Sequence, residues 1–291
     1  MHPFHRGYRL LLGAALLAPG AAVAQESARP AVEVRLLGGL VNPGLAGLNE
    51  AFAGYRAAEQ SGAPLRREPG VRRAVAGEIA GDERFGAGVG GALEVGISRA
   101  AGSEGRRLGL GVRLGYDRVR AGYSASFQDG REGSREELLQ ITRVSLVPRY
   151  SFVTPAFTAT LGATAGVGRL EYRNDARTAL VSPSGASTNP SAGFAGHDSF
   201  WSVGGLAEVE RRLFGRASLT AGIGYDHVPT VELPVSGSDF DAPYRSLSTD
   251  PFPTPTLLAF PEEGGTMGEK PVPVDLSGWR AEAGVRLRVG M

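Results

Sequence analysis

The residues with the clearest potential for chemistry are two histidines that lie next to acids. His197 is followed by Asp198 and Ser199, and His227 is preceded by Asp226. A serine nucleophile needs a general base within hydrogen-bond reach and an acid that orients this base. These residue types could therefore support acyl transfer, provided that the fold brings them together.

The spacing of the two histidines argues against such a site. A tight turn expected at Gly215 would pair His227 with a residue near Val203, six positions after His197. At the rise of a β-strand this separation is on the order of 20 Å, which is too far for a contact between nucleophile and base. The sequence therefore predicts a chain without a catalytic centre.

No pattern typical of a metal or cofactor site is present in the sequence. The chain has no cysteine, which excludes disulfides and thiolate ligands. Its Gly-x-Gly repeats, such as 86–88 and 109–111, lie in alternating segments that no helix follows, unlike a dinucleotide-binding loop. The formal net charge is only +1, so nucleic acid is not an expected partner. We expect no metal and no cofactor.

Alternation of side chains organises the chain, and segment 278–291 shows it best. From Trp279 to Met291 the odd positions are all apolar, and the even positions are charged or glycine. A strand sorts such a sequence onto two faces, whereas a helix scatters it. A charged face with repeated glycine suits the narrow interior of a small membrane barrel.

Seven other segments repeat this alternation and complete a set of eight strands. The strands are predicted at 32–41, 85–98, 107–127, 138–152, 157–172, 201–213, 217–227 and 279–291. Within 157–172, a β-bulge near Gly168 would return Leu170 and Tyr172 to the outer face. Segment 71–80 alternates poorly, and pairing it as well would give the alternative of a ten-stranded barrel.

The connections between these strands alternate in length. Long loops are expected at 42–84, 128–135, 174–198 and 228–277, and short turns centre on Gly102, Thr154 and Gly215. Long loops at one end and short turns at the other are typical of an outer-membrane barrel with both termini in the periplasm. The first long loop holds a short amphipathic helix at 45–60, and the last is acidic and rich in proline.

Outward-facing aromatic residues gather at the strand ends, as in the interfacial girdles of membrane barrels. In a soluble sandwich, the alternative reading, they would instead cap the core. The girdle residues are expected to be Phe85, Tyr116, Tyr172, Trp201, Tyr225 and Trp279 at the loop end, and Tyr150, Phe152, Phe157 and Phe214 at the other end.

The N-terminal segment has the features of a secretory signal peptide. Arg6 and Arg9 precede the apolar run 10–17, and the small-residue pattern 22–24 ends at Ala24. We expect cleavage after Ala24, so that residues 1–24 are removed and residues 25–291 form a single barrel domain. No later segment reaches the roughly 18 apolar residues that a membrane helix needs.

With its signal peptide, alternating strands and unequal loops, the chain resembles the small outer-membrane β-barrels of the OmpA and OmpW kind. The resemblance implies an all-β, antiparallel up-and-down transmembrane barrel in the cell outer membrane of a Gram-negative-type envelope, surrounded by lipid and lipopolysaccharide. The closing strand is similar to the barrel-assembly signal of such proteins, with Glu282, Gly284, Leu287 and Val289 at its polar, glycine and apolar positions. This implies the barrel-assembly machinery as a partner, although the usual terminal aromatic residue is replaced by Met291.

The inner faces of the predicted strands carry charges that are expected to form ion pairs. Eight strands enclose a space that side chains fill, and unpaired charges inside it would be costly. The expected inward set has a net positive charge and comprises Glu94, Arg113, Arg143, Arg149, Glu208, Glu210, Arg212, Arg280, Glu282, Arg286 and Arg288.

The sequence thus predicts a non-enzymatic outer-membrane barrel with a filled, charged lumen and a structural or surface-interaction role of its long loops, whose extracellular partner is open. One alternative is a narrow, porin-like channel that prefers anions. A second follows from the resemblance, because some eight-stranded outer-membrane barrels modify lipid A. Such an enzyme would use His197 and Ser199, or His227. The helix 45–60 could cap the barrel mouth or lie at the membrane surface.

Overall fold

The computed structural model describes residues 30–62, 72–81, 84–101, 105–182, 184–185, 187–189, 191–233, 235–237 and 272–290. The expected signal peptide, residues 1–24, lies outside the described residues, as does most of the expected loop 228–277. Within the described part of the chain, no helix has the length and the apolar character needed to span a membrane.

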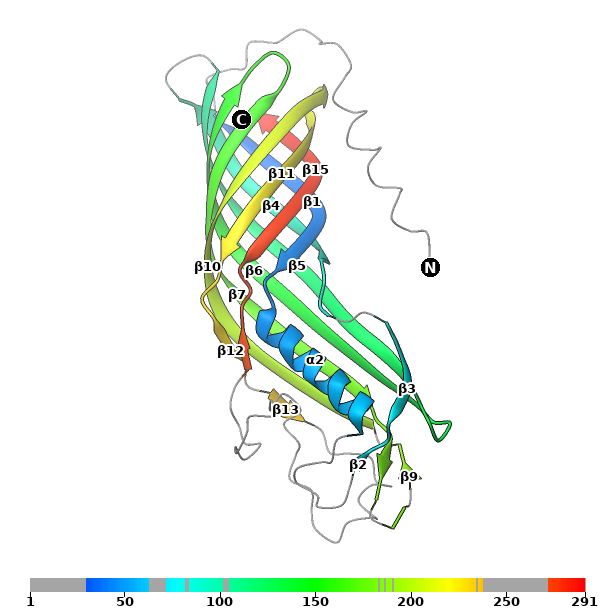
Figure 1. The fold of residues 1–291 in the computed structure, drawn as a ribbon. Coiled ribbons are helices and arrows are strands. Elements are labelled where there is room, and N and C mark those ends of the chain that lie inside the picture. The colour runs from blue at the N-terminus through cyan, green and yellow to red at the C-terminus, as the bar shows by residue number, and fades with distance from the viewer. Residues whose placement is uncertain are drawn as a thin grey trace.

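Eight strands close one antiparallel ring (Figure 1). Each strand pairs with the next along the ring, and the last pairs back with the first from Ala31↔Gly290 to Pro43↔Gly278. The predicted eight-stranded up-and-down barrel is therefore confirmed. In ring order the strands are β1 (Ala31–Pro43), β4 (Gly88–Ala100), β5 (Arg106–Phe127), β6 (Glu132–Val153), β7 (Thr158–Arg177), β10 (Ser191–Phe214), β11 (Ala217–His227) and β15 (Gly278–Gly290).

The alternative of a ten-stranded barrel is wrong. β3 (Ala76–Gly81) lies in the segment that this alternative used, but it pairs with β5 alone, between Tyr123 and Phe127. β4 occupies the same edge of β5 as far as Arg118. β3 therefore continues the wall beyond the end of β4 and adds no strand to the ring. β13 (Val235–Gly237) likewise extends the wall beside β10, beyond the part that β11 pairs.

The two ends of the barrel differ. The ends of β4, β6 and β10 and the starts of β5, β7 and β11 lie at one end, the turn end, together with the start of β1 and the end of β15. The opposite end is the loop end (Figure 1). The loop end carries α2 (Ala46–Ser61), β3 and the short strands β2 (Arg72–Arg73), β8 (Leu180–Val181), β9 (Ser187–Thr188), β12 (Val231–Leu233) and β14 (Val272–Val274).

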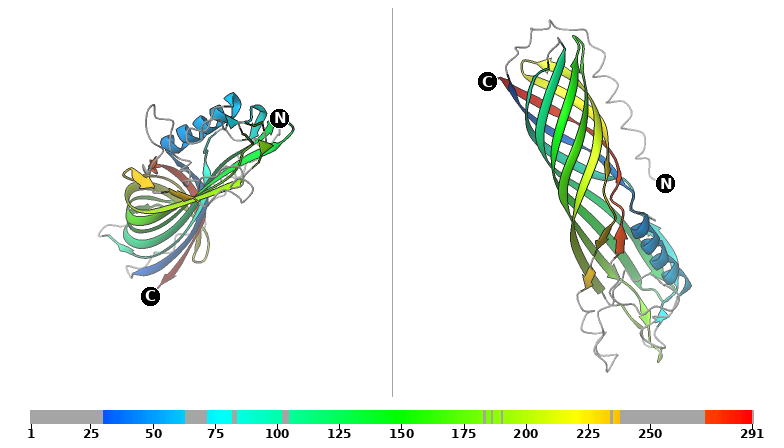
Figure 2. Two further views of the ribbon diagram at one scale, coloured as in Figure 1. Left: turned by 90° about the horizontal axis from the view of Figure 1, so that it is seen from below. Right: turned by 90° about the vertical axis from the view of Figure 1, so that its left-hand side faces the viewer.

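Four neighbouring strands rise past the mouth of the ring at the loop end. β5, β6, β7 and β10 are 20 to 24 residues long, whereas β1, β4, β11 and β15 have 11 to 13 residues. The long strands form a curved wall beyond the closed ring, with α2 beside it (Figure 2).

The long strands occupy residues whose polar sequence predicts loops. β5 and β6 pair as far as Ser126↔Glu132, so the expected loop 128–135 is a link of residues 128–131. β7 and β10 pair as far as Arg177↔Ser191, which shortens the expected loop 174–198 to 178–190. These strand ends lie beyond the apolar belt of the barrel. A strand needs no apolar outer face there, so its polar sequence looks like that of a loop.

The expected bulge in β7 is absent, and this changes the place of two aromatic residues. The register of β7 with β6 and β10 is unbroken past Gly168, so Leu170 and Tyr172 stay on the inner face and are fully buried. Tyr172 is therefore not a girdle residue, and neither is Phe85, which is 4% exposed. Both expectations fail because the inner face is apolar at the loop end.

α2 lies against the open side of the long-strand wall and covers this apolar interior (Figure 2). Leu48 and Phe52 are completely buried, and the Phe52 ring lies 5.3 Å from Tyr123, edge-on, and 6.3 Å from Phe85. The loop-end core comprises Val41, Leu45, Leu48, Phe52, Ala74, Phe85, Val119, Ala121, Tyr123, Ala125, Phe127, Leu139, Ile141, Leu170, Tyr172, Ala179, Phe200, Val228, Val231, Leu233, Val274 and Leu276.

The start of α2 is tied to the strand that closes the ring. The backbone N–H groups of Gly44 and Leu45 donate to the carbonyls of Ser277 and Asp275 at 2.8 and 2.9 Å. Since these carbonyls directly precede β15, the first turn of α2 is held beside the β1–β15 seam.

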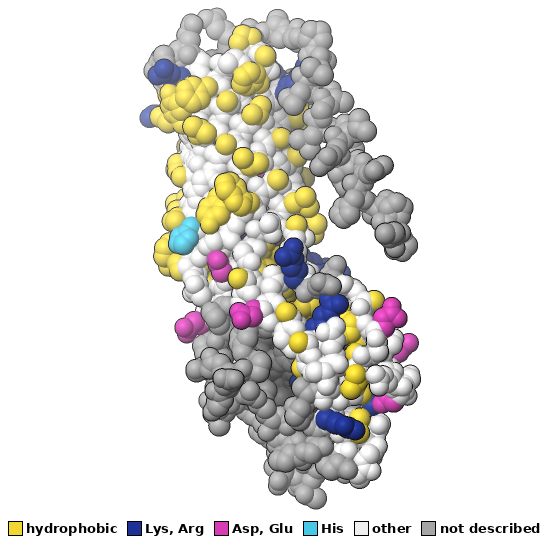
Figure 3. Space-filling model, in the orientation of Figure 1, with side chains coloured by type: hydrophobic (Ala, Val, Ile, Leu, Met, Phe, Trp, Pro, Cys, Tyr) yellow, Lys and Arg dark blue, Asp and Glu magenta, His cyan; other side chains and the backbone are white. Residues whose placement is uncertain are grey.

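An apolar belt surrounds the ring between its two ends. Outward side chains such as Leu36, Leu110, Val167 and Ile223 are more than half exposed, and apolar side chains spread over the barrel surface in Figure 3. The predicted aromatics Tyr116, Trp201, Tyr225 and Trp279 border the belt at the loop end, and Phe152, Phe157 and Phe214 are exposed at the turn end, where Tyr150 packs edge-on against Phe152.

Candidate functional site

The interior of the ring is filled by three tiers of ion pairs. In the tier nearest the turn end, Glu33 Oε1 accepts hydrogen bonds from Ser98 Oγ at 2.6 Å and from Arg286 Nη1 and Arg288 Nη2, both at 3.3 Å. Arg286 also forms an ion pair with Glu210. This tier joins β1, β4, β10 and β15.

The middle tier is centred on Glu208. Its Oε2 accepts from Arg35 Nη1 at 2.6 Å, and its Oε1 accepts from Arg149 Nη2 at 3.1 Å. Arg35 and Glu208 stand on β1 and β10, which are three places apart in the ring. Their side chains therefore meet across the lumen, not along its wall. All three residues are at most 7% exposed.

Three further residues complete the middle tier. Arg113 Nε donates to Glu94 Oε2 at 3.1 Å, and Arg113 Nη1 donates to Glu282 Oε2 at 2.9 Å. Arg149 also forms an ion pair with Glu94. Because Arg113 on β5 and Glu282 on β15 are again three places apart, the guanidinium groups fill the cross-section of the barrel.

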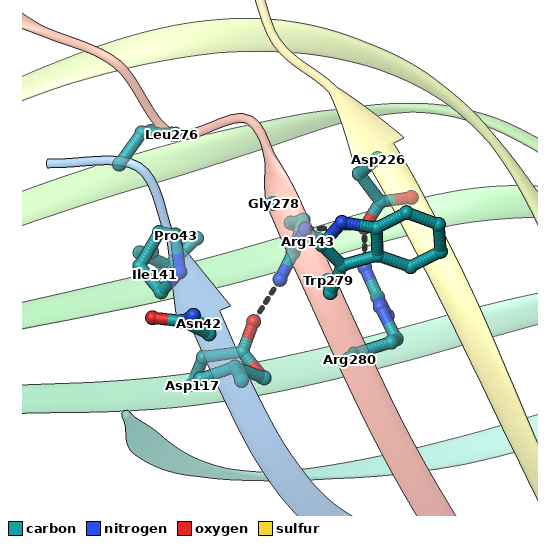
Figure 4. A pocket seen from close by; sticks show the side chains of 11 residues that line it. Asn42, Pro43, Asp117, Ile141, Arg143, Asp226, Leu276, Gly278, Trp279 and Arg280 are labelled. Atoms are coloured by element: carbon teal, nitrogen blue, oxygen red, sulfur yellow. Dashed lines mark hydrogen bonds and ion pairs between the residues drawn. The ribbon is translucent and has the colours of Figure 1, made fainter. Parts of the chain in front are cut away.

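The third tier lies under the loop-end core. Arg143 forms ion pairs with Asp117 and Asp226, and Arg280 also pairs with Asp226 (Figure 4). Thr164 Oγ1 donates to Asp226 Oδ1 at 3.0 Å. The cavity beside these residues has a volume of about 20 Å³, which is room for about one water molecule.

Glycines on the inner face make space for these charged side chains. A Cβ atom at Gly111 would lie 2.8 Å from Glu94 Oε1, and one at Gly204 would lie 2.5 Å from Asp226 Oδ1. Real Cβ atoms do not approach so closely. The alternation of glycine with charge in the sequence is thus a packing requirement of a narrow lumen.

The ion pairs of the three tiers are balanced in charge, and the expected positive excess is not found among them. Asp117, Asp226, Glu33 and Arg35 join the set, and Arg212 leaves it. The pairs link the arginines Arg35, Arg113, Arg143, Arg149, Arg280, Arg286 and Arg288 to the carboxylates Glu33, Glu94, Asp117, Glu208, Glu210, Asp226 and Glu282. Arg107 lies at the rim of the turn end, partly exposed.

Arg212 lies at the rim of the lumen, outside the three tiers of ion pairs. It stays in register with the buried Ser218, and the register shift of β10 comes only after it, before Phe214. Arg212 is exposed, and its Nε and Nη2 donate to the Gly215 carbonyl at 3.1 and 2.9 Å. This arginine therefore stabilises the turn and joins none of the ion pairs of the three tiers.

Four charged residues of the lumen that are missing from the predicted set follow the same alternation as its members. Glu33 and Arg35 occupy alternate positions of β1, and Asp117 continues the inner row of Arg113 on β5. Asp226 likewise ends the inner row of β11. Extending the two-residue period to both ends of each strand would have found all four.

The histidines and the serine of the enzyme hypothesis are kept apart. His227 pairs with Val203, as predicted, and lies far along the sheet from His197. His197 and Ser199 are exposed, whereas Asp198 between them is partly buried. Because neighbouring residues of a strand point to opposite faces, Asp198 cannot orient either neighbour as a triad acid would.

A separate buried polar cluster lies at the loop end. Arg135 Nε and Asn174 Nδ2 donate to Glu137 Oε1 at 2.6 and 2.8 Å. From α2, Glu59 reaches the same wall, and its Oε1 accepts from Thr178 Oγ1 at 3.1 Å. Burial raises the pKa of the Glu59 carboxyl above its usual 4.5, and the hydrogen bonds it accepts offset only part of this. Among the described residues, no group of three or more His, Cys, Asp or Glu side chains could hold a metal ion.

Comparisons with known proteins give a likeness of fold. A scan against protein-family models finds no match, and neither does a search of curated proteins. Among solved structures, the chain is similar to Neisserial surface protein A (NspA), with 10% identity and a TM-score of 0.33 over 89% of this chain and 96% of that chain. It is also similar to the outer membrane protein OprG from Pseudomonas aeruginosa, with 11% identity and a TM-score of 0.40 over 91% and 97%.

The barrel itself is established by strand pairing, and these distant likenesses add no further conclusion. The resemblance to small outer-membrane β-barrels is one of fold.

We predict that Glu208→Gln destabilises the barrel strongly. The change removes the buried carboxylate that Arg35 and Arg149 share and leaves them only Glu33 and Glu94 as partners. Removing one partner of a buried ion pair costs about 3–5 kcal/mol. Glu171→Gln is the matched control, because its ion pair with Arg169 is exposed and is worth about 1 kcal/mol or less. Urea unfolding in detergent micelles would measure both. Equal midpoints for the two variants would contradict the buried network.

Glu59→Gln should remove a pH dependence of α2 docking. Since the pKa of Glu59 is higher in the folded state than its usual 4.5, the folded state binds the proton more tightly. The docked helix therefore loses stability as the pH rises from 4.5 through the raised pKa, and keeps it below 4.5. Hydrogen exchange of α2 amides in the native chain and the variant, compared at each pH, would show the difference. A constant ratio of the two rates between pH 4.5 and 8 would contradict this assignment.

Proposed function

We propose that this chain is a non-enzymatic β-barrel of the cell outer membrane with a closed lumen, and that its function lies in contacts made by its outer surfaces. One observation carries the proposal: ion pairs such as Arg35–Glu208 and Arg113–Glu282 join strands on opposite sides of the ring. Arginines that are held by carboxylates across the lumen leave no open path along the axis of a barrel of eight strands.

Membrane placement is supported by the outer face of the ring. Its apolar belt is bordered by Trp201, Tyr225 and Trp279 at one end and by Phe157 and Phe214 at the other. A soluble protein rarely exposes an apolar surface of this extent. In the outer membrane, the short links of the turn end would face the periplasm and the loop end would face outward.

The loop-end core closes the lumen a second time. Phe52 of α2 and the inner faces of β5, β6 and β7 form an apolar plug directly beyond the tier of Arg143 and Asp226. This arrangement supports a cap at the barrel mouth as the role of α2. An anion-preferring channel would need a positive excess in an open lumen, and the paired charges of the three tiers do not supply it.

Assembly of the barrel would depend on β15. This strand carries the similarity to the barrel-assembly signal, and its lipid-facing Val285, Leu287 and Val289 are 40–50% exposed. It pairs with β1 on one side, where the ring closes, and with β11 on the other. We infer that the assembly machinery recognises this strand before β1 pairs with it.

Planar bilayer recordings test the closed lumen. The folded mature chain, reconstituted over a range of protein concentrations, should give no sustained conductance steps, because the lumen is filled at both the ion-pair tiers and the cap. A general porin reconstituted in parallel serves as the positive control. Reproducible conductance steps, with a reversal potential in a salt gradient that shows anion selectivity, would overturn the proposal in favour of a channel.

A further inference from the structure

Four arginines stand on the outer face of two strands, separated by one strand between them. Arg118 and Arg120 are on β5, and Arg169 and Arg173 are on β7. A row here means residues of β5, β6 and β7 that lie side by side across the sheet. The strand pairings place Tyr116 in one row with Arg169, Arg118 in the next with Glu171, and Arg120 in the third with Arg173. Because strands lie about 4.8 Å apart, Arg120 and Arg173 start about 10 Å from each other. Their long side chains can therefore reach a common ligand over β6.

The arginines begin where the apolar belt ends. On β5 the outward residues run from Leu108 through Tyr116 before Arg118, and on β7 Val167 precedes Arg169. On the other half of the ring, the described outward residues at the loop-end edge of the belt include Asn42, Tyr225 and Trp279, which carry no charge. These four arginines thus lie on one side of the barrel, directly beyond the apolar belt, where the headgroups of a surrounding membrane would lie.

The residues around the arginines order them without neutralising them. Glu171 pairs with Arg169 Nε at 3.2 Å, and both side chains are exposed. Gln140 of β6, between Arg118 and Glu171, donates its Nε2 to Tyr116 Oη at 2.5 Å. The Nε of Arg118 is buried, with no hydrogen-bond partner among the described residues. These three rows carry four guanidinium groups and only one carboxylate, so this part of the outer surface has a positive excess.

Acids limit the face at its far edge. The next outward row beyond Arg120 and Arg173 contains Glu136 on β6 and Asp175 on β7. An anion that binds the arginines would be repelled one row further out. The surface therefore selects negative charge at a single height, directly above the belt.

We propose that Arg118, Arg120, Arg169 and Arg173 bind the phosphate groups of the outer-leaflet glycolipid, lipid A. This deepens the proposed function, on which it rests, by naming the partner of one outer surface. Arginine holds phosphate by paired, charge-assisted hydrogen bonds, and lipid A presents phosphates at the boundary between its acyl chains and the aqueous phase. The acyl chains would lie on the belt below the arginines, between Tyr116 and Trp201.

Native mass spectrometry of the full mature chain, folded in detergent and titrated with lipid A, tests the assignment. The probes are bis-phosphorylated lipid A and the same lipid after enzymatic removal of its phosphates. The double variant R120Q/R173Q removes two exposed arginines of the face. The double variant R99Q/R106Q removes two exposed arginines at the turn end and serves as the matched control.

The native chain and the control should bind phosphorylated lipid A at least tenfold more tightly than the dephosphorylated lipid. R120Q/R173Q should lose this preference, and millimolar inorganic phosphate should not compete. Equal binding of both lipids by the native chain, or an unchanged preference in R120Q/R173Q, would overturn the assignment. Heat-modifiable gel migration, recorded for every variant, separates this outcome from failure of the barrel itself, because an unfolded chain shows no shift.

Discussion

Closure of an eight-stranded ring is the constraint from which the rest of this structure follows. The ring is too narrow to leave its inward charges in bulk water, so each must find a partner inside. Pairs such as Arg35–Glu208 meet that demand across the lumen. Glycines on the inner face leave room for the paired side chains, as Gly111 does for Glu94 of the neighbouring strand. The outer face, which needs no such pairing, is left free to be apolar over the belt and cationic above it.

The sequence predicts the ring well, because a two-residue period is a local property of each strand. It places Arg113, Glu208 and Arg286 inside before any pairing is known. The alternation of apolar and polar residues is harder to interpret where a strand leaves the apolar belt. Beyond the belt, strands such as the end of β5 are polar outside, while their inner faces turn apolar under α2. Tyr172 and Phe85 were therefore assigned to the girdles although they are buried.

The balance of charge in the lumen could not be read from an incomplete inner row. Asp226 lies at the end of β11, where the period is easily abandoned too soon, whereas Asp117 lies within β5 and continues the inner row of Arg113. Arg212 follows the inner row of β10 but comes after Glu210, at the exposed rim, where it binds the Gly215 carbonyl and not a carboxylate of the tiers. With Glu33, Arg35, Asp117 and Asp226 included, the filled lumen that the sequence predicts has paired charges without the expected positive excess, beneath an apolar cap. Recognition is then left to the outer surfaces.

The most direct test of ring closure uses the absence of cysteine in the native chain. Leu36 on β1 and Val285 on β15 are lipid-facing partners across the seam, within the reach of a disulfide. Leu36 and Leu287 are diagonal neighbours, about 7–8 Å apart, and serve as the slipped pair. Oxidation of each double-cysteine variant in membranes should cross-link the first pair and spare the second, as read from gel mobility. Absence of the first cross-link, or preference for the second, would contradict the closed ring and its register.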